Sequence, residues 1–110
     1  MYYLEGVLAL IESYNTGADA SCIATASGMA AIASAADNLL CVDPANPDQK
    51  MNFVATCQVY GGTFQQFAIR KEQERNVEWR KVINSADINE WESLIDDNTR
   101  FLYGEMPSNP

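Results

Sequence analysis

Histidine is absent from this 110-residue sequence, and cysteine occurs only at Cys22, Cys41 and Cys57. A structural zinc site uses closely spaced cysteine and histidine ligands, so we expect no metal site. A disulfide framework needs an even number of cysteines, and three widely spaced ones favour free thiols in a reducing cytoplasm. Two of them fall in predicted strands and the third just after a predicted helix, so we expect all three thiols to be at least partly buried.

Basic residues are also scarce, because seven Lys and Arg stand against 15 Asp and Glu, for a formal net charge of −8. A surface of this charge repels nucleic acid and anionic membranes. No apolar run has the length that spans a bilayer, and the first residues lack the pattern of a secretory signal. We therefore expect neither nucleic acid nor a membrane as a partner, and a cytoplasmic location.

Hydrophobic residues make up 47% of the chain, enough for the core of one small domain or of a piece of a larger one. Apolar residues at helical spacing predict helices over residues 2–13, 28–40, 64–74 and 88–95. Apolar or alternating runs predict strands over residues 21–25, 52–57, 77–83 and 100–105. Helices and strands alternate along the chain, which is typical of an α/β layer with a largely parallel sheet.

Helix boundaries are predicted at two places. Gly17 is expected to end the first helix. Asp87 and Glu90 match the capping-box pattern, in which the first residue caps the helix and the second bonds back to it. The last helix is expected to bury its apolar positions, which are Ile88, Trp91, Leu94 and Ile95.

A turn of small residues at Ser27-Gly28-Met29 is the first candidate for a ligand site. Ser27 is a good N-cap for the following helix, and Gly28 lacks the Cβ that would keep a ligand from the backbone. A helix N-terminus of this kind offers N–H groups and the positive end of a helix dipole to a phosphate. A bare Ser-Gly turn before a helix is more often only a cap, so the motif is weak by itself.

Two further candidates follow predicted strands, and ligands of open α/β sheets collect at the carboxyl ends of strands. Tyr60 precedes Gly61-Gly62, either as a packed turn residue or as a ring face offered to a flat ligand. Glu105 begins the stretch that ends in Pro107-Ser108-Asn109-Pro110. The two prolines form a structural turn by default, and they also restrict the backbone around Asn109.

These motifs occur together in the order and rough spacing of one family. They are Leu4-Glu5 with the following helix, the stretch from Thr25 to Ile32, the stretch from Tyr60 to Phe64, and the stretch from Glu105 to Pro110. Over essentially its whole length the sequence resembles the pyridoxal-phosphate enzymes of cysteine and methionine metabolism. That group includes cystathionine γ-synthase, cystathionine β- and γ-lyases, methionine γ-lyase and O-acetylhomoserine sulfhydrylase.

The resemblance implies a fold and a set of site residues. The fold is part of a fold-type I large domain, a mostly parallel sheet with helices on both faces, and the cofactor is pyridoxal 5'-phosphate. Ser27, Gly28 and Met29 would bind the cofactor phosphate through the turn and its backbone amides. Tyr60 would stack on the pyridine ring and assist proton transfer as a catalytic residue. Asn109 would hydrogen-bond the phenolic oxygen of the ring, while Glu105 would lie near the site without an assigned role.

The resemblance also implies γ- or β-elimination or replacement on sulfur amino acids or activated homoserine esters, in a homo-oligomer that is a dimer of dimers. Gly62 stands where the methionine-specific lyase carries cysteine, which counts modestly against that enzyme. Lys50, Lys71 and Lys81 lack the context of the family's cofactor-linked lysine. Residues 1–110 are therefore expected to be the N-terminal part of a large domain truncated at both ends, and inactive alone. The alternative is a non-catalytic α/β module that binds a phosphate ligand or a partner chain.

Overall fold

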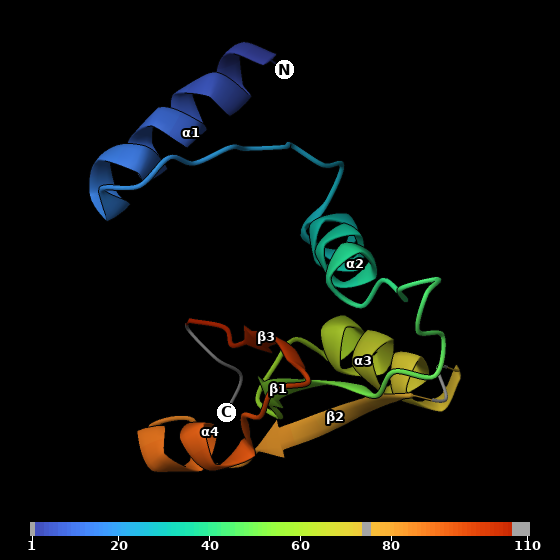
Figure 1. Ribbon diagram of the computed structural model, residues 1–110. Coiled ribbons are helices and arrows are strands. Elements are labelled where there is room, and N and C mark those ends of the chain that lie inside the picture. Colours follow the sequence, from blue (N-terminus) through green and yellow to red (C-terminus); the bar gives the residue numbers. More distant parts are fainter. Residues whose placement is uncertain (1, 74–75, 107–110) are drawn as a thin grey trace. The chain divides into compact units, whose positions relative to one another are not determined.

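The computed structural model describes residues 2–73 and 76–106, with side chains over 3–70 and 76–106. In these residues the elements are α1 (Tyr2–Thr16), α2 (Gly28–Leu39), β1 (Met51–Thr56), α3 (Gly61–Gln73), β2 (Val77–Val82), α4 (Ile88–Leu94) and β3 (Thr99–Tyr103) (Figure 1). The chain divides into two units, Met1–Ala31 and Ile32–Pro110, and the boundary between them falls inside α2.

The first unit contains α1 and an irregular segment that leads to α2. Gly17 ends α1 as predicted: its φ is +69°, a left-handed conformation that glycine adopts without strain, and its N–H donates to the carbonyl of Ser13 at 3.0 Å. The apolar side chains of Leu4, Leu8 and Ile11 on α1 are exposed.

The predicted strand over 21–25 is wrong, because these residues have no regular structure. Backbone groups of the irregular segment that contains them find side-chain partners on α1 in place of a neighbouring strand. The N–H of Ala20 donates to Ser13 Oγ at 2.9 Å, and the N–H of Ala24 donates to Glu5 Oε1 at 2.7 Å. Hydrogen bonds of this kind satisfy an extended chain without a ladder.

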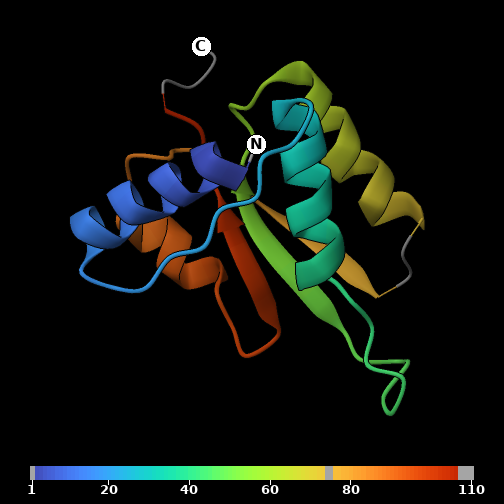
Figure 2. The ribbon, with the colours of Figure 1, turned by 90° about the horizontal axis from the view of Figure 1, so that it is seen from above.

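The second unit contains a parallel sheet in the order β2-β1-β3, which confirms the α/β prediction. Phe53 of β1 pairs with Trp79 of β2, and Ala55 of β1 pairs with Tyr103 of β3. All six residues of the central strand are buried, as its apolar sequence predicted. The first crossover runs from β1 to β2 through α3, and the second runs from β2 past β1 to β3 through α4. Figure 2 shows α3 and α4 on opposite sides of the strands.

An aromatic cluster forms the core on the face that α3 covers. The rings of Phe53 and Phe101 stack with centroids 4.9 Å apart, and Phe67 of α3 lies edge-on to Tyr103 at 5.2 Å. Leu40 after α2 and Ile32 of that helix also pack on this cluster. The core therefore holds α3 against the sheet close to the carboxyl ends of β1 and β3.

Two details of α4 differ from the sequence prediction. Asp87 caps the helix as expected, but Glu90 accepts hydrogen bonds from the N–H groups of Ile83 and Asn84, at 2.8 and 2.9 Å. Its carboxylate thus ties the end of β2 to α4. Ile88 is 68% exposed and Ile95 is 43% exposed, so only the other two predicted positions, Trp91 and Leu94, are half-buried.

Two further boundaries and one burial prediction also need correction. The third helix begins at Gly61, three residues earlier than predicted, so the two glycines belong to its first turn. Cys57 lies just past the end of β1, and Cys22 lies in the irregular segment. All three cysteines are free; Cys22 and Cys57 are partly buried, whereas Cys41 is exposed, because it follows α2 on a surface turn.

Candidate functional site

The carboxyl ends of β1 and β3 bring two predicted site residues together. The backbone N–H of Tyr60, in the segment after β1, donates to Glu105 Oε2 after β3 at 2.8 Å. The other carboxylate oxygen, Glu105 Oε1, accepts from the hydroxyl of Tyr103 at 2.9 Å. Residues 45 positions apart in the sequence therefore meet at one edge of the sheet.

Tyr60 is the residue from which α3 starts. Its carbonyl accepts the N–H of Phe64 at 3.0 Å, the first hydrogen bond of that helix. Its side chain is 61% exposed, so the ring is not a packed turn residue. The other interpretation of this motif, a ring face offered to a flat ligand, stays a prediction.

Tyr103 and Thr63 complete this cluster, and sequence reasoning did not single them out. Thr63 is fully buried, and its side chain hydrogen-bonds the hydroxyl of Tyr103. Burial raises the pKa of the Tyr103 phenol above its ordinary value, and the carboxylate of Glu105 raises this pKa further. The sequence did contain an indication of Tyr103, because this residue precedes Glu105 by two positions. Residues at that spacing in an extended chain face the same side.

Ser27 and Gly28 lie in the first unit, at the start of α2. Ser27 is the predicted cap, since its hydroxyl oxygen accepts the N–H of Ala30 at 3.1 Å and its carbonyl accepts the N–H of Ala31 at 3.1 Å. A Cβ added to Gly28 would have no other atom within 4 Å. The first turn of α2, with Gly28 and Met29, thus has an ordered backbone and open space beside it, which suits an anion.

Asn109 lies outside the described residues, so its predicted contact with the cofactor ring stays a prediction. Two of the three lysines have described side chains. Lys50 is exposed, and the Lys81 ammonium lies 4.7 Å from the ring centroid of Trp79, a cation–π contact on the surface. Both fit the expectation that these are ordinary surface residues.

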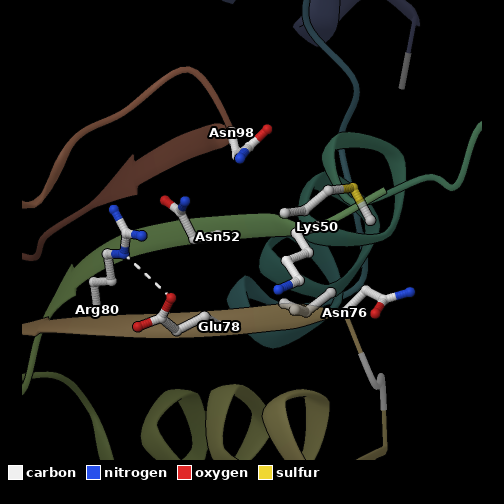
Figure 3. A pocket seen from close by; sticks show the side chains of 8 residues that line it. Lys50, Asn52, Asn76, Glu78, Arg80 and Asn98 are labelled. Atoms are coloured by element: carbon white, nitrogen blue, oxygen red, sulfur yellow. Dashed lines mark hydrogen bonds and ion pairs between the residues drawn. The ribbon is translucent and has the colours of Figure 1, made fainter. Parts of the chain in front are cut away.

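A hollow of about 190 Å³ lies at the opposite end of the sheet (Figure 3). Its lining includes the residue just before each strand, namely Lys50, Asn76 and Asn98. It contains none of the predicted site residues. Because ligands of open α/β sheets bind at the carboxyl ends of strands, its position at the amino ends does not favour it as the active site.

Beside this hollow, a hydrogen-bond network centres on Asp96. Its carboxylate accepts from Asn52 Nδ2 at 2.9 Å and pairs with Arg80 Nη1 at 2.8 Å. Thr99 donates in turn to the amide oxygen of Asn52 at 2.6 Å. The hydrogen bond from Asn52, with others from the Asn98 backbone and from Arg80, lowers the pKa of Asp96 below its ordinary value. The network joins all three strands at their amino ends.

Within residues 2–73 and 76–106, no group of His, Cys, Asp and Glu side chains is arranged to hold a metal ion. None of the helices in this part of the chain combines the length and the apolar character needed to cross a bilayer.

A model of the family described as Cys/Met metabolism PLP-dependent enzymes matches residues 3–110. The matched segment contains all of the candidate motifs, from the turn at Ser27 to the stretch that ends at Pro110. Comparisons with curated proteins and with solved structures gave no match.

Proposed function

Because the chain belongs to the family of pyridoxal-phosphate-dependent enzymes of cysteine and methionine metabolism, we propose that it serves γ- or β-elimination or replacement on sulfur amino acids or activated homoserine esters. The match over residues 3–110 carries this proposal. The alternating helices and parallel strands are consistent with a fragment of a fold-type I domain. A non-catalytic module that only binds a phosphate ligand or a partner chain is not favoured, since the family is one of enzymes.

The described residues fit the cofactor at two places. The turn at Gly28 is open where a Cβ would stand, and the ring of Tyr60 is exposed above a fixed backbone. Pyridoxal phosphate, when bound, supplies the electron sink that stabilises negative charge on the substrate amino acid.

Each site residue has a role in this proposal. The backbone amides of Gly28 and Met29 bind the phosphate at the N-terminus of α2, which Ser27 caps. Tyr60 offers its ring face to the pyridine ring, and its hydroxyl moves a proton at the substrate. Asn109 donates to the phenolic oxygen of the ring. The capped helix and the exposed ring support the first two roles.

Residues 1–110 are, in this proposal, part of the large domain of a longer cytoplasmic enzyme that assembles as a dimer of dimers. The cation–π contact of Lys81 and the exposed loop position of Lys50 support the proposal that the cofactor-linked lysine lies elsewhere in that enzyme, since neither resembles a lysine held for covalent attachment of a cofactor. The 110-residue chain alone is accordingly expected to show no turnover. Release of a 2-oxo acid by the purified chain with added pyridoxal phosphate would contradict that expectation.

The experiment that tests the function uses the complete enzyme with its cofactor. Visible absorbance after dialysis reports bound pyridoxal phosphate, and the substrates are cystathionine, methionine and O-acetylhomoserine with a thiol. Formation of a 2-oxo acid indicates elimination, and formation of a thioether indicates replacement. We expect one of the two with at least one substrate. A cofactor-loaded enzyme that gives neither product with any of them, but acts on another class of amino acid, would refute the proposal.

A further inference from the structure

The carboxylate of Glu105 uses both oxygens to connect a half-buried side chain with an exposed loop. One oxygen accepts from Tyr60 N–H at 2.8 Å, and the other accepts from the Tyr103 hydroxyl at 2.9 Å. The resemblance to the family assigned no role to this glutamate. Its contacts point to one, because it touches the backbone of the residue whose ring is proposed to face the cofactor.

The hydrogen bond to Tyr60 replaces a missing helix cap. A tyrosine at the N-cap cannot accept from the first turn with a short polar side chain, as Ser or Asp would. In a capping box, a glutamate three residues into the helix accepts the N–H of the N-cap residue, but Thr63 occupies that position in α3. Glu105 supplies the same contact from the far end of the sequence.

Glu105 is itself held by the core. Tyr103 belongs to β3, pairs with Ala55 of the central strand, and lies edge-on to Phe67 at an interplanar angle of 86°. The buried Thr63 hydrogen-bonds the same phenol. The line of contact therefore runs from a rigid strand, through a half-buried phenol and a carboxylate, to the backbone of Tyr60.

We propose that Glu105 is a positioning residue that fixes the backbone of Tyr60, and with it the point from which the Tyr60 ring reaches the cofactor. The proposal rests on the proposed function, because the ring needs a fixed position only if a cofactor stacks on it. Glu105 acts through geometry and not through its charge. A displacement of about 1 Å at a reacting group reduces turnover by roughly 100-fold, so loss of this contact has a measurable effect.

The test uses the complete enzyme and four variants. Glu105→Ala removes both contacts. Glu105→Gln keeps both, because its amide oxygen accepts from Tyr60 N–H and its NH₂ donates to the hydroxyl of Tyr103. Of these two contacts, Tyr103→Phe removes only the hydrogen bond between the Tyr103 hydroxyl and Glu105. Glu92→Ala is the matched control, since Glu92 is an exposed glutamate of α4 whose side chain makes no hydrogen bond or ion pair within the described part of the chain.

Three readouts separate the possible outcomes. Hydrogen exchange of the Tyr60 amide in the cofactor-free enzyme reports the hydrogen bond directly. Circular dichroism of the bound cofactor reports the ring environment, and kcat reports turnover. In Glu105→Ala we expect faster exchange, a changed dichroism band and a kcat at least tenfold lower. In Glu105→Gln we expect an exchange rate and a kcat within about threefold of the parent values and an unchanged dichroism band, since both contacts persist. All three readouts should be intermediate in Tyr103→Phe and unchanged in Glu92→Ala.

Each contrary result has one meaning. Unchanged amide exchange in Glu105→Ala would show that the contact does not hold Tyr60, and would overturn the proposal whatever the enzyme does. Faster exchange with an unaltered dichroism band and kcat would overturn the positioning role. A Glu105→Gln variant as slow as Glu105→Ala would assign the role to the charge and equally overturn it. A parent enzyme that binds no pyridoxal phosphate would refute the proposed function, while the exchange data would still test the contact.

Discussion

The two ends of the parallel sheet each carry a hydrogen-bond network around one carboxylate, and the networks differ in what they hold. At the amino ends, Asp96 joins Asn52 and Arg80 of two neighbouring strands. At the carboxyl ends, Glu105 joins Tyr103 of a strand to Tyr60 in a loop. The first network therefore stabilises the sheet, whereas the second presents an exposed ring. The carboxylates of Asp96 and Glu105 thus have different roles, because the partners of Asp96 lie in two strands and one partner of Glu105 lies in a loop.

The largest effect is expected at Gly28, in the turn that is proposed to bind the cofactor phosphate. Gly28→Val places a branched side chain in open space that the cofactor phosphate is proposed to occupy. It should weaken cofactor binding by at least about 3 kcal/mol, the scale of one or two charge-assisted hydrogen bonds. Gly6→Val is the matched control, because Gly6 is also a helical glycine with no atom within 4 Å of an added Cβ. Retained cofactor absorbance in dialysed Gly28→Val enzyme would refute the assignment of this turn.

The second effect is expected at Tyr60. Tyr60→Phe keeps the ring face and the backbone hydrogen bond to Glu105 but removes the hydroxyl. Bound cofactor should be retained, while kcat falls by roughly 100-fold if the hydroxyl transfers a proton. Absorbance and steady-state kinetics measured on the same preparation check this. Loss of the cofactor with the ring still present would assign the hydroxyl to binding instead.

The third effect tests the amino-end network. Asn52 is 3% exposed, and Asn52→Ala removes the side-chain acceptor of the Thr99 hydroxyl and one of the hydrogen bonds that Asp96 accepts. The free energy of unfolding should fall by about 1–3 kcal/mol, as measured by urea denaturation. Asn89→Ala, at an exposed position of α4, is the control. Cofactor affinity of the folded Asn52→Ala enzyme should equal that of the parent; a selective loss of affinity would contradict the division between the two ends.

The smallest effects concern the pH dependence of stability, which should be opposite at the two ends of the sheet. The pKa of Asp96 is lowered in the folded chain. Its contribution to stability is present above its ordinary pKa of 3.8 and is lost as the pH falls through the folded value. The stability difference between the parent and Asp96→Asn should therefore shrink in acid. Urea midpoints measured from pH 6 to 3 check this; a constant difference would contradict it.

At the carboxyl ends, the pKa of Tyr103 is raised, chiefly by burial. Its contribution to stability is present below its ordinary pKa of 10.0 and is lost as the pH rises through the folded value. The stability difference between the parent and Tyr103→Phe should shrink in alkali. The absorbance of the phenolate measures the titration directly, and a midpoint at or below the ordinary pKa would refute the burial argument.

Local features of the chain followed from the sequence by itself. Gly17 ends α1, Ser27 caps α2 and Asp87 caps α4, as predicted. The order of helices and strands after residue 27 and the full burial of β1 were predicted as well. Capping and periodicity depend on residues within a few positions of one another, so they can be read without the fold. The family, too, followed from motifs in the sequence.

Contacts between distant segments were decided only by the tertiary structure. Residues 21–25 have the composition of a strand, but the N–H of Ala24 donates to the Glu5 side chain of α1. Ile88 stays exposed although it lies at an apolar helix position. Glu105 had no assigned role until the sheet placed the end of β3 beside the start of α3. The physical reason is that a hydrogen-bond partner 19 to 45 residues away leaves no local pattern in the sequence, and only the tertiary fold brings it within reach.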